Sequence, residues 1–210
     1  MSIRHDAVLL IGPTGSGKSP LGDHLEEHGL AGRRCHHFDF GSRLRQIALE
    51  EVPPEEFTPH EHLFVREVLE KALLLEGEHF PLAQKIVSSF LRQRYCRQGE
   101  TLILNGLPRH AGQAAAMDGL VSISRLVVLE CSTETVHERI RKNTGQDRTG
   151  RPDDERHLIE KKLRQFQERT APLIGHYEDR GCKIIRIRVT GDTATGAVYE
   201  ELVRVRPTGR

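Results

Sequence analysis

Aromatic side chains are scarce in this 210-residue chain, which has no tryptophan, three tyrosines and seven phenylalanines. An excess of charge of one sign is lacking as well, because 31 Lys and Arg residues are balanced by 30 Asp and Glu residues. Proteins that bind single-stranded nucleic acid stack bases on aromatic rings within a positively charged groove. The composition provides neither feature, so we expect no nucleic-acid partner.

Long hydrophobic runs and paired cysteines are also missing. No stretch approaches the ~20 apolar residues of a transmembrane helix, and the apolar run at residues 7–11 is too short for the core of a signal peptide. The four cysteines, Cys35, Cys96, Cys131 and Cys182, lie far apart and form no C-x-x-C pair, as is usual in a reducing compartment. We therefore expect a cytoplasmic protein with no membrane partner.

Twelve histidines raise the question of a metal site. The tightest groups are His36-His37 and His60-x-His62. Neighbouring residues of a strand point to opposite faces of a sheet, and residues two apart on a helix do not face each other. Because no group has the spacing of a zinc site, we interpret these histidines as ordinary surface or pocket residues.

Short apolar runs alternate with segments of helical spacing along the chain. Runs of strand length occupy residues 7–11, 101–104, 126–129 and 183–187, with a weaker one at 35–38. The clearest helical pattern covers residues 153–180 and ends before Gly181, a residue type that often follows the last helical turn. Strands alternating with helices predict an α/β fold, in which a five-stranded parallel sheet carries helices on both faces within one domain, residues 1–210.

A phosphate-binding motif follows the first apolar run directly. It reads Gly12-Pro13-Thr14-Gly15-Ser16-Gly17-Lys18-Ser19 and leads into a segment that is helical to about residue 28. This is the G-x-x-x-x-G-K-[ST] pattern between a strand and a helix, the setting that a chance glycine-rich turn lacks. The loop amides and the helix N-terminus cradle phosphates. We expect Lys18 to reach the β- and γ-phosphates of ATP, and Ser19 to meet Mg²⁺.

Further along, Asn105-Gly106-Leu107-Pro108-Arg109 followed by Gln113 resembles the D-G-F-P-R-x-x-x-Q segment of the adenylate kinase and nucleoside monophosphate kinase family. Other family landmarks occur in the same order, at residues 38–45, 77–81, 149–154, 170–177 and at Gly191. The resemblance covers almost the whole chain. It implies a P-loop NTPase three-layer fold with two insertions, a monophosphate-binding helical segment at residues 41–80 and a short lid at residues 142–152.

The resemblance also implies roles for single residues. Arg109 and Arg45 would clamp the acceptor phosphate, and Arg151 would close over the transferred group from the lid. With Lys18, these three arginines form the expected catalytic set. Arg139 would lie against the base of ATP, which the loop containing Gly191 would touch. The expected acceptor-binding residues are Phe40, Arg45, Gly77, Phe80, Gly106, Arg109, Gln113, Arg151 and Lys162, and Gln113 favours adenine as the acceptor base.

Several positions depart from the family pattern. The family aspartate before Gly106 is Asn105, so we expect weaker metal binding or a carboxylate supplied from elsewhere. Pro20 replaces a common threonine, and Phe40 replaces a small hydroxyl residue. Asn143 and Lys162 replace arginines, and a lysine does not reproduce the bidentate guanidinium fork. Arg141 or Arg148 could compensate, but Arg148 has no family counterpart and we interpret it as solvated.

Together, these features predict a nucleoside monophosphate kinase that transfers the γ-phosphoryl group of Mg·ATP to AMP. We expect ATP and Mg²⁺ as its cofactors, small-molecule nucleotides as its partners and a monomeric state. Two alternatives remain open. Phe40, Asn143 and Lys162 favour a P-loop kinase that acts on a different small phosphate acceptor. Asn105 and the missing arginines favour a nucleotide-binding sensor with weak transfer activity.

Overall fold

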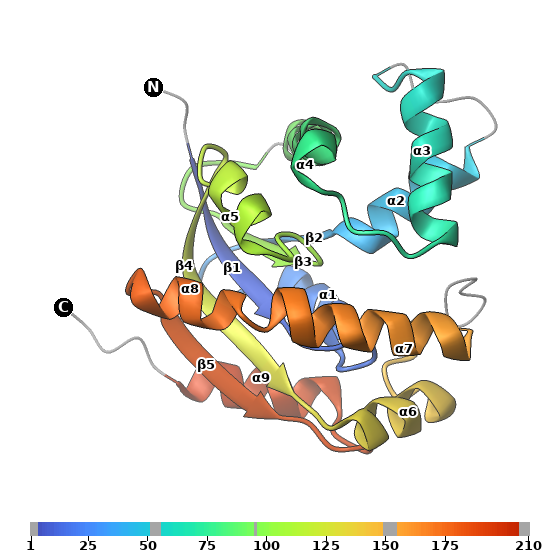
Figure 1. Ribbon diagram of the computed structural model, residues 1–210. Helices are drawn as coiled ribbons and strands as arrows, with labels where there is room; N and C mark the ends of the chain where they lie inside the picture. The colour runs from blue at the N-terminus through green and yellow to red at the C-terminus, as the bar shows by residue number, and fades with distance from the viewer. Residues whose placement is uncertain (1–3, 51–55, 95, 149–154, 206–210) are drawn as a thin grey trace.

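The computed structural model describes residues 4–50, 56–94, 96–148 and 155–205, which form a sheet enclosed by helices (Figure 1). The sheet has five parallel strands in the order β2-β3-β1-β4-β5. The strands are β1 His5–Ile11, β2 Cys35–Asp39, β3 Thr101–Asn105, β4 Val121–Glu130 and β5 Lys183–Arg188. The predicted α/β fold is therefore confirmed.

The helices fill the connections between these strands. They are α1 Lys18–His28, α2 Phe40–Leu49, α3 Pro59–Glu70, η1 Gly77–His79, α4 Phe80–Gln93, α5 Ala111–Met117, α6 Thr133–Lys142, α7 Arg156–Gln165, η2 Phe166–Thr170, α8 Leu173–Asp179 and α9 Thr195–Arg204. The segment predicted as a monophosphate-binding insertion, residues 41–80, contains most of α2 together with α3 and η1. None of the helices in the described ranges has both the length and the apolar character of a transmembrane segment.

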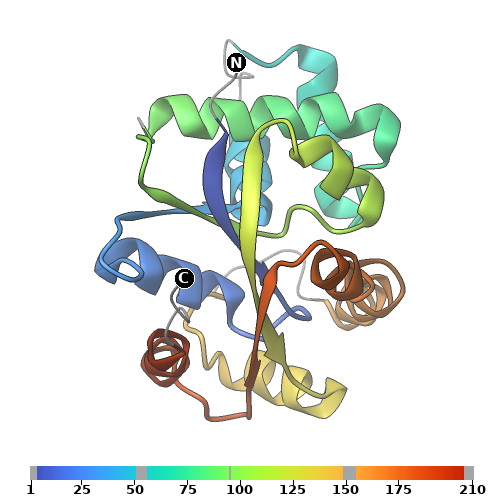
Figure 2. The same ribbon diagram turned by 90° about the vertical axis from the view of Figure 1, so that its left-hand side faces the viewer.

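Alternate residues of the central strands enter opposite faces of the sheet, because side chains of a strand point up and down in turn. In β1, Ala7, Leu9 and Ile11 belong to one buried cluster, whereas Val8 and Leu10 belong to another. Helices α4, α5 and α8 contribute to the first cluster, and α1 and α9 to the second. Figure 2 shows α1 and α9 on one side of the sheet and α5 and α8 on the other. The domain therefore has three layers.

A third buried cluster lies apart from the sheet. Val136 of α6 packs with Ile159 and Leu163 of α7, and the partly buried Cys131 and Ile140 contact the same group. This small cluster holds α6 and α7 together on either side of the segment predicted to be the lid. That segment, residues 142–152, is described only as far as residue 148.

The prediction of a single helix over residues 153–180 is wrong in part. The described chain is α-helical over α7, widens into the π-helical turn η2, and becomes α-helical again in α8. Pro172 precedes α8 and has no N–H to donate to the carbonyl four residues earlier. The chain instead closes a wider turn, in which the Ala171 amide donates to the Phe166 carbonyl at 2.8 Å. Gly181 has the expected left-handed conformation, with φ of 76°.

Four of the histidines, His36, His37, His62 and His110, lie in the interior rather than on the surface. His36 is paired with Glu100 at 2.7 Å, His37 with Asp23 at 2.8 Å, and the ring of His62 with the Ile47 carbonyl at 2.8 Å. Within the described ranges, no group of three or more His, Cys, Asp or Glu side chains is arranged to hold a metal ion. These histidines therefore serve packing and hydrogen bonding.

Candidate active site

A pocket opens at the carboxyl ends of β1, β2 and β3, the edge where parallel α/β sheets bind ligands. The phosphate loop, Gly12–Ser19, forms its floor between β1 and α1. Gly17 is the N-cap residue immediately before α1, and its φ of 98° is a conformation that residues with a Cβ rarely adopt. Gly12 has no room for a side chain, since a Cβ there would lie 2.9 Å from the Leu129 carbonyl oxygen. The sequence thus allows the loop to curl tightly against β4.

Lys18 folds back over the loop that carries it. Its Nζ donates to the carbonyl oxygens of Gly12 and Pro13, both at 2.7 Å. Burial, followed by the nearby guanidinium groups of Arg109 and Arg148, lowers the pKa of the Lys18 amine to about 7. Three cationic side chains therefore face one small space at the phosphate loop, and a bound polyphosphate would relieve their mutual repulsion.

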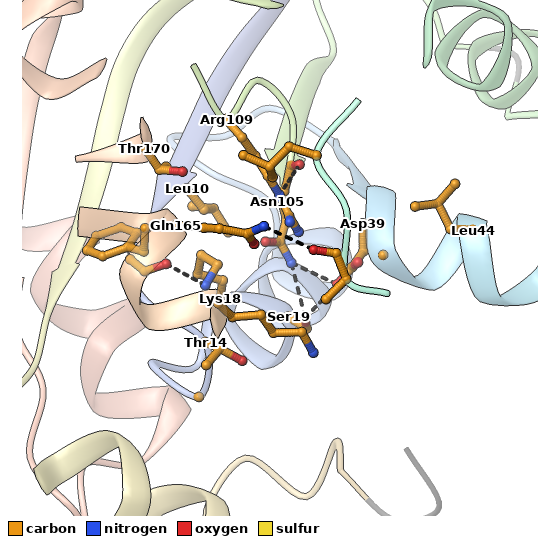
Figure 3. A pocket seen from close by; sticks show the side chains of 18 of the residues that line it. Leu10, Thr14, Lys18, Ser19, Asp39, Leu44, Asn105, Arg109, Gln165 and Thr170 are labelled. Carbon is orange, nitrogen blue, oxygen red and sulfur yellow. Dashed lines mark hydrogen bonds between the residues drawn. The ribbon is translucent and has the colours of Figure 1, made fainter. Parts of the chain in front are cut away.

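Ser19, Asp39 and Asn105 form a hydrogen-bonded group beside Lys18, as the dashed lines of Figure 3 show. The Ser19 hydroxyl donates to Oδ2 of Asp39 at 2.5 Å. The Asn105 amide donates to the same carboxylate oxygen at 2.7 Å and to Ser19 Oγ at 3.0 Å. Asp39 and Asn105 are paired residues at the ends of β2 and β3, so the sheet register places them side by side.

Asn105 stands where the family has an aspartate, and the carboxylate of Asp39 lies directly beside it. Burial alone would raise the pKa of Asp39, but hydrogen bonds from Ser19 and from the Ser42 amide outweigh it and keep the pKa below its usual value. The other carboxylate oxygen accepts the Ser42 amide at 2.8 Å and caps α2. An ionised carboxylate, a hydroxyl and an amide oxygen are hard donors that suit Mg²⁺. The residues present therefore fit a magnesium ion.

The acceptor side of the pocket carries the two predicted clamp residues. Arg45 of α2 and Arg109 after β3 both line the pocket, and the guanidinium of Arg109 donates to the Gly106 carbonyl at 2.9 Å. Leu44 of α2 and Phe166 of η2 add apolar side chains to the lining of the same pocket. Lys162 lines it as well. Two of the predicted arginines and the predicted lysine thus share one pocket with Lys18.

Arg148 also lines the pocket, contrary to its interpretation as a solvated residue. Its Nη2 donates to Oγ1 of Thr14 at 3.0 Å, so the guanidinium lies on the phosphate loop itself. The sequence offered no family position for Arg148, and only the turn that follows α6 brings it here. Arg151, the lid residue that the resemblance singled out, lies outside the described residues and its role stays a prediction.

Four other predicted acceptor residues, Phe40, Gly77, Phe80 and Gln113, are not among the residues that line the pocket. Gln113 is buried, its Oε1 accepts the Arg109 amide at 2.7 Å, and its Nε2 donates to the Leu75 carbonyl at 2.6 Å. Phe40 and Phe80 are buried in the main apolar cluster, and Gly77 begins the short helix η1. Gly106 does line the pocket. In this arrangement Gln113 supports the backbone beside Arg109, and its contact with an acceptor base stays a prediction.

Two residues predicted to approach the ATP base lie behind the phosphate loop. Arg139 is buried and donates from Nε to the Gly15 carbonyl at 3.1 Å, and from Nη1 to the carbonyls of Thr190 and Thr193. The Gly191 carbonyl accepts the hydroxyl of Thr144 at 3.0 Å. Arg139 thus joins the phosphate loop to the loop after β5, and neither residue lines the described pocket.

Comparisons with known proteins agree with this architecture. A family model described as AAA domain matches residues 8–160. An adenylate kinase of Bifidobacterium longum is 34% identical over 117 residues, which cover 52% of this chain and 61% of that relative. An adenylate kinase of Synechococcus sp. strain WH7803 is 32% identical over 184 residues, which cover 84% of this chain and 87% of the relative.

A solved structure extends the likeness of the fold. The gluconokinase of Sinorhizobium meliloti 1021 superposes with a TM-score of 0.53 at 16% identity, over 96% of this chain and 92% of that one. The family match covers more than half of the chain, and the Synechococcus relative is matched over most of its length. The chain therefore belongs to the AAA domain family, is related to adenylate kinases and is a phosphotransferase.

Proposed function

We propose that the protein is a nucleoside monophosphate kinase, which transfers the γ-phosphoryl group of Mg·ATP to AMP. The observation that carries the proposal is the pocket in which Lys18, Arg45 and Arg109 lie together with the pair Ser19 and Asp39. The phosphate loop accounts for the donor nucleotide. The two arginines on the opposite side of the same pocket account for a second phosphate group.

Phosphoryl transfer makes few covalent demands on a protein, so positioning and charge stabilisation supply most of the catalysis. Lys18 lies over the phosphate loop, where it would stabilise the charge that develops on the transferred group. Arg109 approaches the same space from the end of β3, held by the Gly106 carbonyl. The acceptor phosphate supplies its own oxygen nucleophile, so the protein needs no nucleophilic side chain.

Ser19 and Asp39 would hold the magnesium ion, with Asn105 orienting the Asp39 carboxylate by its amide hydrogen bond. Held by these residues, Mg²⁺ would supply positive charge to neutralise the phosphates. Because hydrogen bonds from Ser19 and Ser42 keep Asp39 ionised, this carboxylate is available at neutral pH without a prior deprotonation.

Fewer observations support AMP as the acceptor than support phosphoryl transfer itself. Relatives named adenylate kinase support AMP, but both polar atoms of the Gln113 side-chain amide are engaged with backbone groups. Each of these atoms can form one more hydrogen bond, but the residue is only 2% exposed, so reading a base requires the ligand to reach a buried amide. A second candidate, transfer to a different small phosphate acceptor that Gln113 does not contact, follows from that observation.

A substrate panel tests these candidates. Steady-state transfer from Mg·ATP to AMP, CMP, UMP, GMP and dTMP should give ADP from ATP and AMP, with kcat falling about 100-fold or more in Lys18→Ala. The exposed Arg141→Ala variant is a matched control and should retain activity. Turnover absent for every monophosphate, while ATP still binds, would overturn the proposal and direct attention to other phosphate acceptors.

A further inference from the structure

The turn after α6 is held in place by contacts made on both of its sides. Asn143 ends α6 in the left-handed conformation, with φ of 48°, which asparagine tolerates better than most residues. Its carbonyl accepts the Gln146 amide at 2.8 Å, and its side-chain Oδ1 accepts the Arg148 amide at 3.1 Å. The side chain at position 143 therefore fixes the backbone at position 148.

The same turn is packed against the helix that follows the phosphate loop. A Cβ on Gly145 would lie 2.9 Å from Cγ of Pro20, so the backbone of Gly145 sits directly on that proline ring. Thr144 binds the Gly191 carbonyl from the other side. Pro20, one of the departures from the family pattern, thus provides a flat surface against which the turn is seated.

The position of Arg148 follows from these contacts. Its guanidinium donates to the hydroxyl of Thr14 at 3.0 Å and lines the pocket together with Lys18 and Arg109. Arg109 follows β3 and is held by the Gly106 carbonyl, whereas Arg148 follows α6 and is held on the phosphate loop by Thr14. A phosphate oxygen is a stronger acceptor for a guanidinium than a neutral hydroxyl is.

We propose that Arg148 binds the terminal phosphate of the donor nucleotide and that Asn143 is its positioning residue, so that two residues here replace the single family arginine at position 143. Loop amides and the helix N-terminus receive the phosphates nearer the nucleoside. Arg148 lines the same pocket as Lys18, the residue expected to reach the β- and γ-phosphates. The inference rests on the proposed function only for the transfer step, since binding of a triphosphate requires no acceptor.

Nucleotide binding without an acceptor provides the test. In Arg148→Ala, calorimetry should show the Kd of a non-hydrolysable ATP analogue rising about 10- to 100-fold, as expected for a lost charged hydrogen bond. The Kd of ADP should change less than about threefold, because ADP has no terminal phosphate at that position. Arg141→Ala, which removes an exposed arginine of α6, should leave both constants unchanged. Arg148→Lys, which keeps the charge but not the fork, should fall in between.

The positioning role of Asn143 needs a separate variant. Asn143→Gly removes the side-chain acceptor but keeps the left-handed backbone accessible, and it should weaken the ATP analogue with ADP little affected. Combined with Arg148→Ala it should add nothing further, because both act through one guanidinium. Additive effects would overturn the role of Asn143, and equal losses for ADP and the ATP analogue in Arg148→Ala would overturn that of Arg148. Wild-type discrimination between the two nucleotides without turnover of any monophosphate would refute the proposed function alone.

Discussion

The hydroxyl of Ser19 donates to the carboxylate of Asp39 at 2.5 Å, across 20 residues of sequence. Ser19 lies in the first turn of α1, which follows β1, and Asp39 ends β2, which is separated from β1 by β3. The contact therefore links the segment that follows β1 to a strand that is not adjacent to β1 in the sheet. It brings a carboxylate to Ser19, the residue proposed to hold Mg²⁺, from a strand that the family pattern did not suggest.

Moving that carboxylate tests its role. Asp39→Asn should lower kcat by about 100-fold or more, since the ion that neutralises phosphate charge loses its charged partner. The double variant Asp39→Asn with Asn105→Asp returns the carboxylate to the neighbouring strand end, because the two positions are paired in register. It should recover activity at raised Mg²⁺ concentration, which a magnesium titration of the initial rate measures. Equal activity of Asp39→Asn and the wild type at low Mg²⁺ would exclude Asp39 from metal binding.

The lowered pKa of Lys18 predicts proton uptake on nucleotide binding. Without ligand the amine has a pKa of about 7, so at pH 8 it is mostly neutral. Bound phosphates favour the charged form and raise this pKa, so nucleotide affinity should fall as pH rises above 7, by at most about tenfold per pH unit. Calorimetry of ADP binding at pH 8 in buffers of different protonation enthalpy should show this uptake. Lys18→Ala should abolish the uptake, and its absence from the wild type would contradict the assignment.

Substitution of Gln113 separates a base-reading role from a structural one. Gln113→Leu leaves the Arg109 amide without its acceptor and removes one of the two side chains that contact the Leu75 carbonyl, since the His110 ring also lies 3.3 Å from it. The free energy of unfolding should fall by about 1–3 kcal/mol for the unsatisfied amide. Denaturant unfolding measures this loss. If Gln113 also reads adenine, kcat/KM for AMP should fall more than kcat/KM for the other monophosphates. A uniform loss over the panel would assign Gln113 to the support of Arg109.

Two substitutions of Arg109 should separate the contribution of its charge from that of its planar guanidinium. Arg109→Lys keeps a cation but loses the planar fork and the Nε donor that binds the Gly106 carbonyl. We expect Arg109→Ala to lower kcat/KM for the acceptor by about 100-fold or more, and Arg109→Lys to recover only a small part. Steady-state kinetics with the acceptor varied at saturating ATP measure both. Full recovery by lysine would show that Arg109 acts as a simple charge.

Much of the fold could be predicted from the sequence because its signals are local. The five apolar runs became the five strands, and the glycine-rich motif lies between β1 and α1 as expected. β4 is longer than its apolar run, because residues 121–125 alternate in burial where only one face is covered. The interruption at Pro172 was missed, because the apolar spacing continues through it.

The missing parts of the site depend on distant contacts. Asp39 and Asn105 are neighbours only because β2 and β3 pair in a register that no single segment specifies. Arg148 reaches Thr14 across 134 residues of sequence, through a turn whose shape depends on Asn143 and Pro20. The resemblance could identify the positions at which a family residue is missing. It could not identify the residues that take over their roles, because those residues are neighbours in the folded structure and not in the sequence.

The small cluster of Val136, Ile159 and Leu163 has a consequence for how the pocket exchanges ligands. It is separate from the two clusters that bury the sheet, so parting α6 from α7 exposes few apolar side chains and leaves the sheet core intact. Local opening costs less free energy where fewer apolar contacts are broken. In hydrogen-exchange experiments, amides of α6 and α7 should therefore exchange by local fluctuation well before those of β1 and β4, and nucleotides should slow this exchange by bridging Arg148 and the phosphate loop.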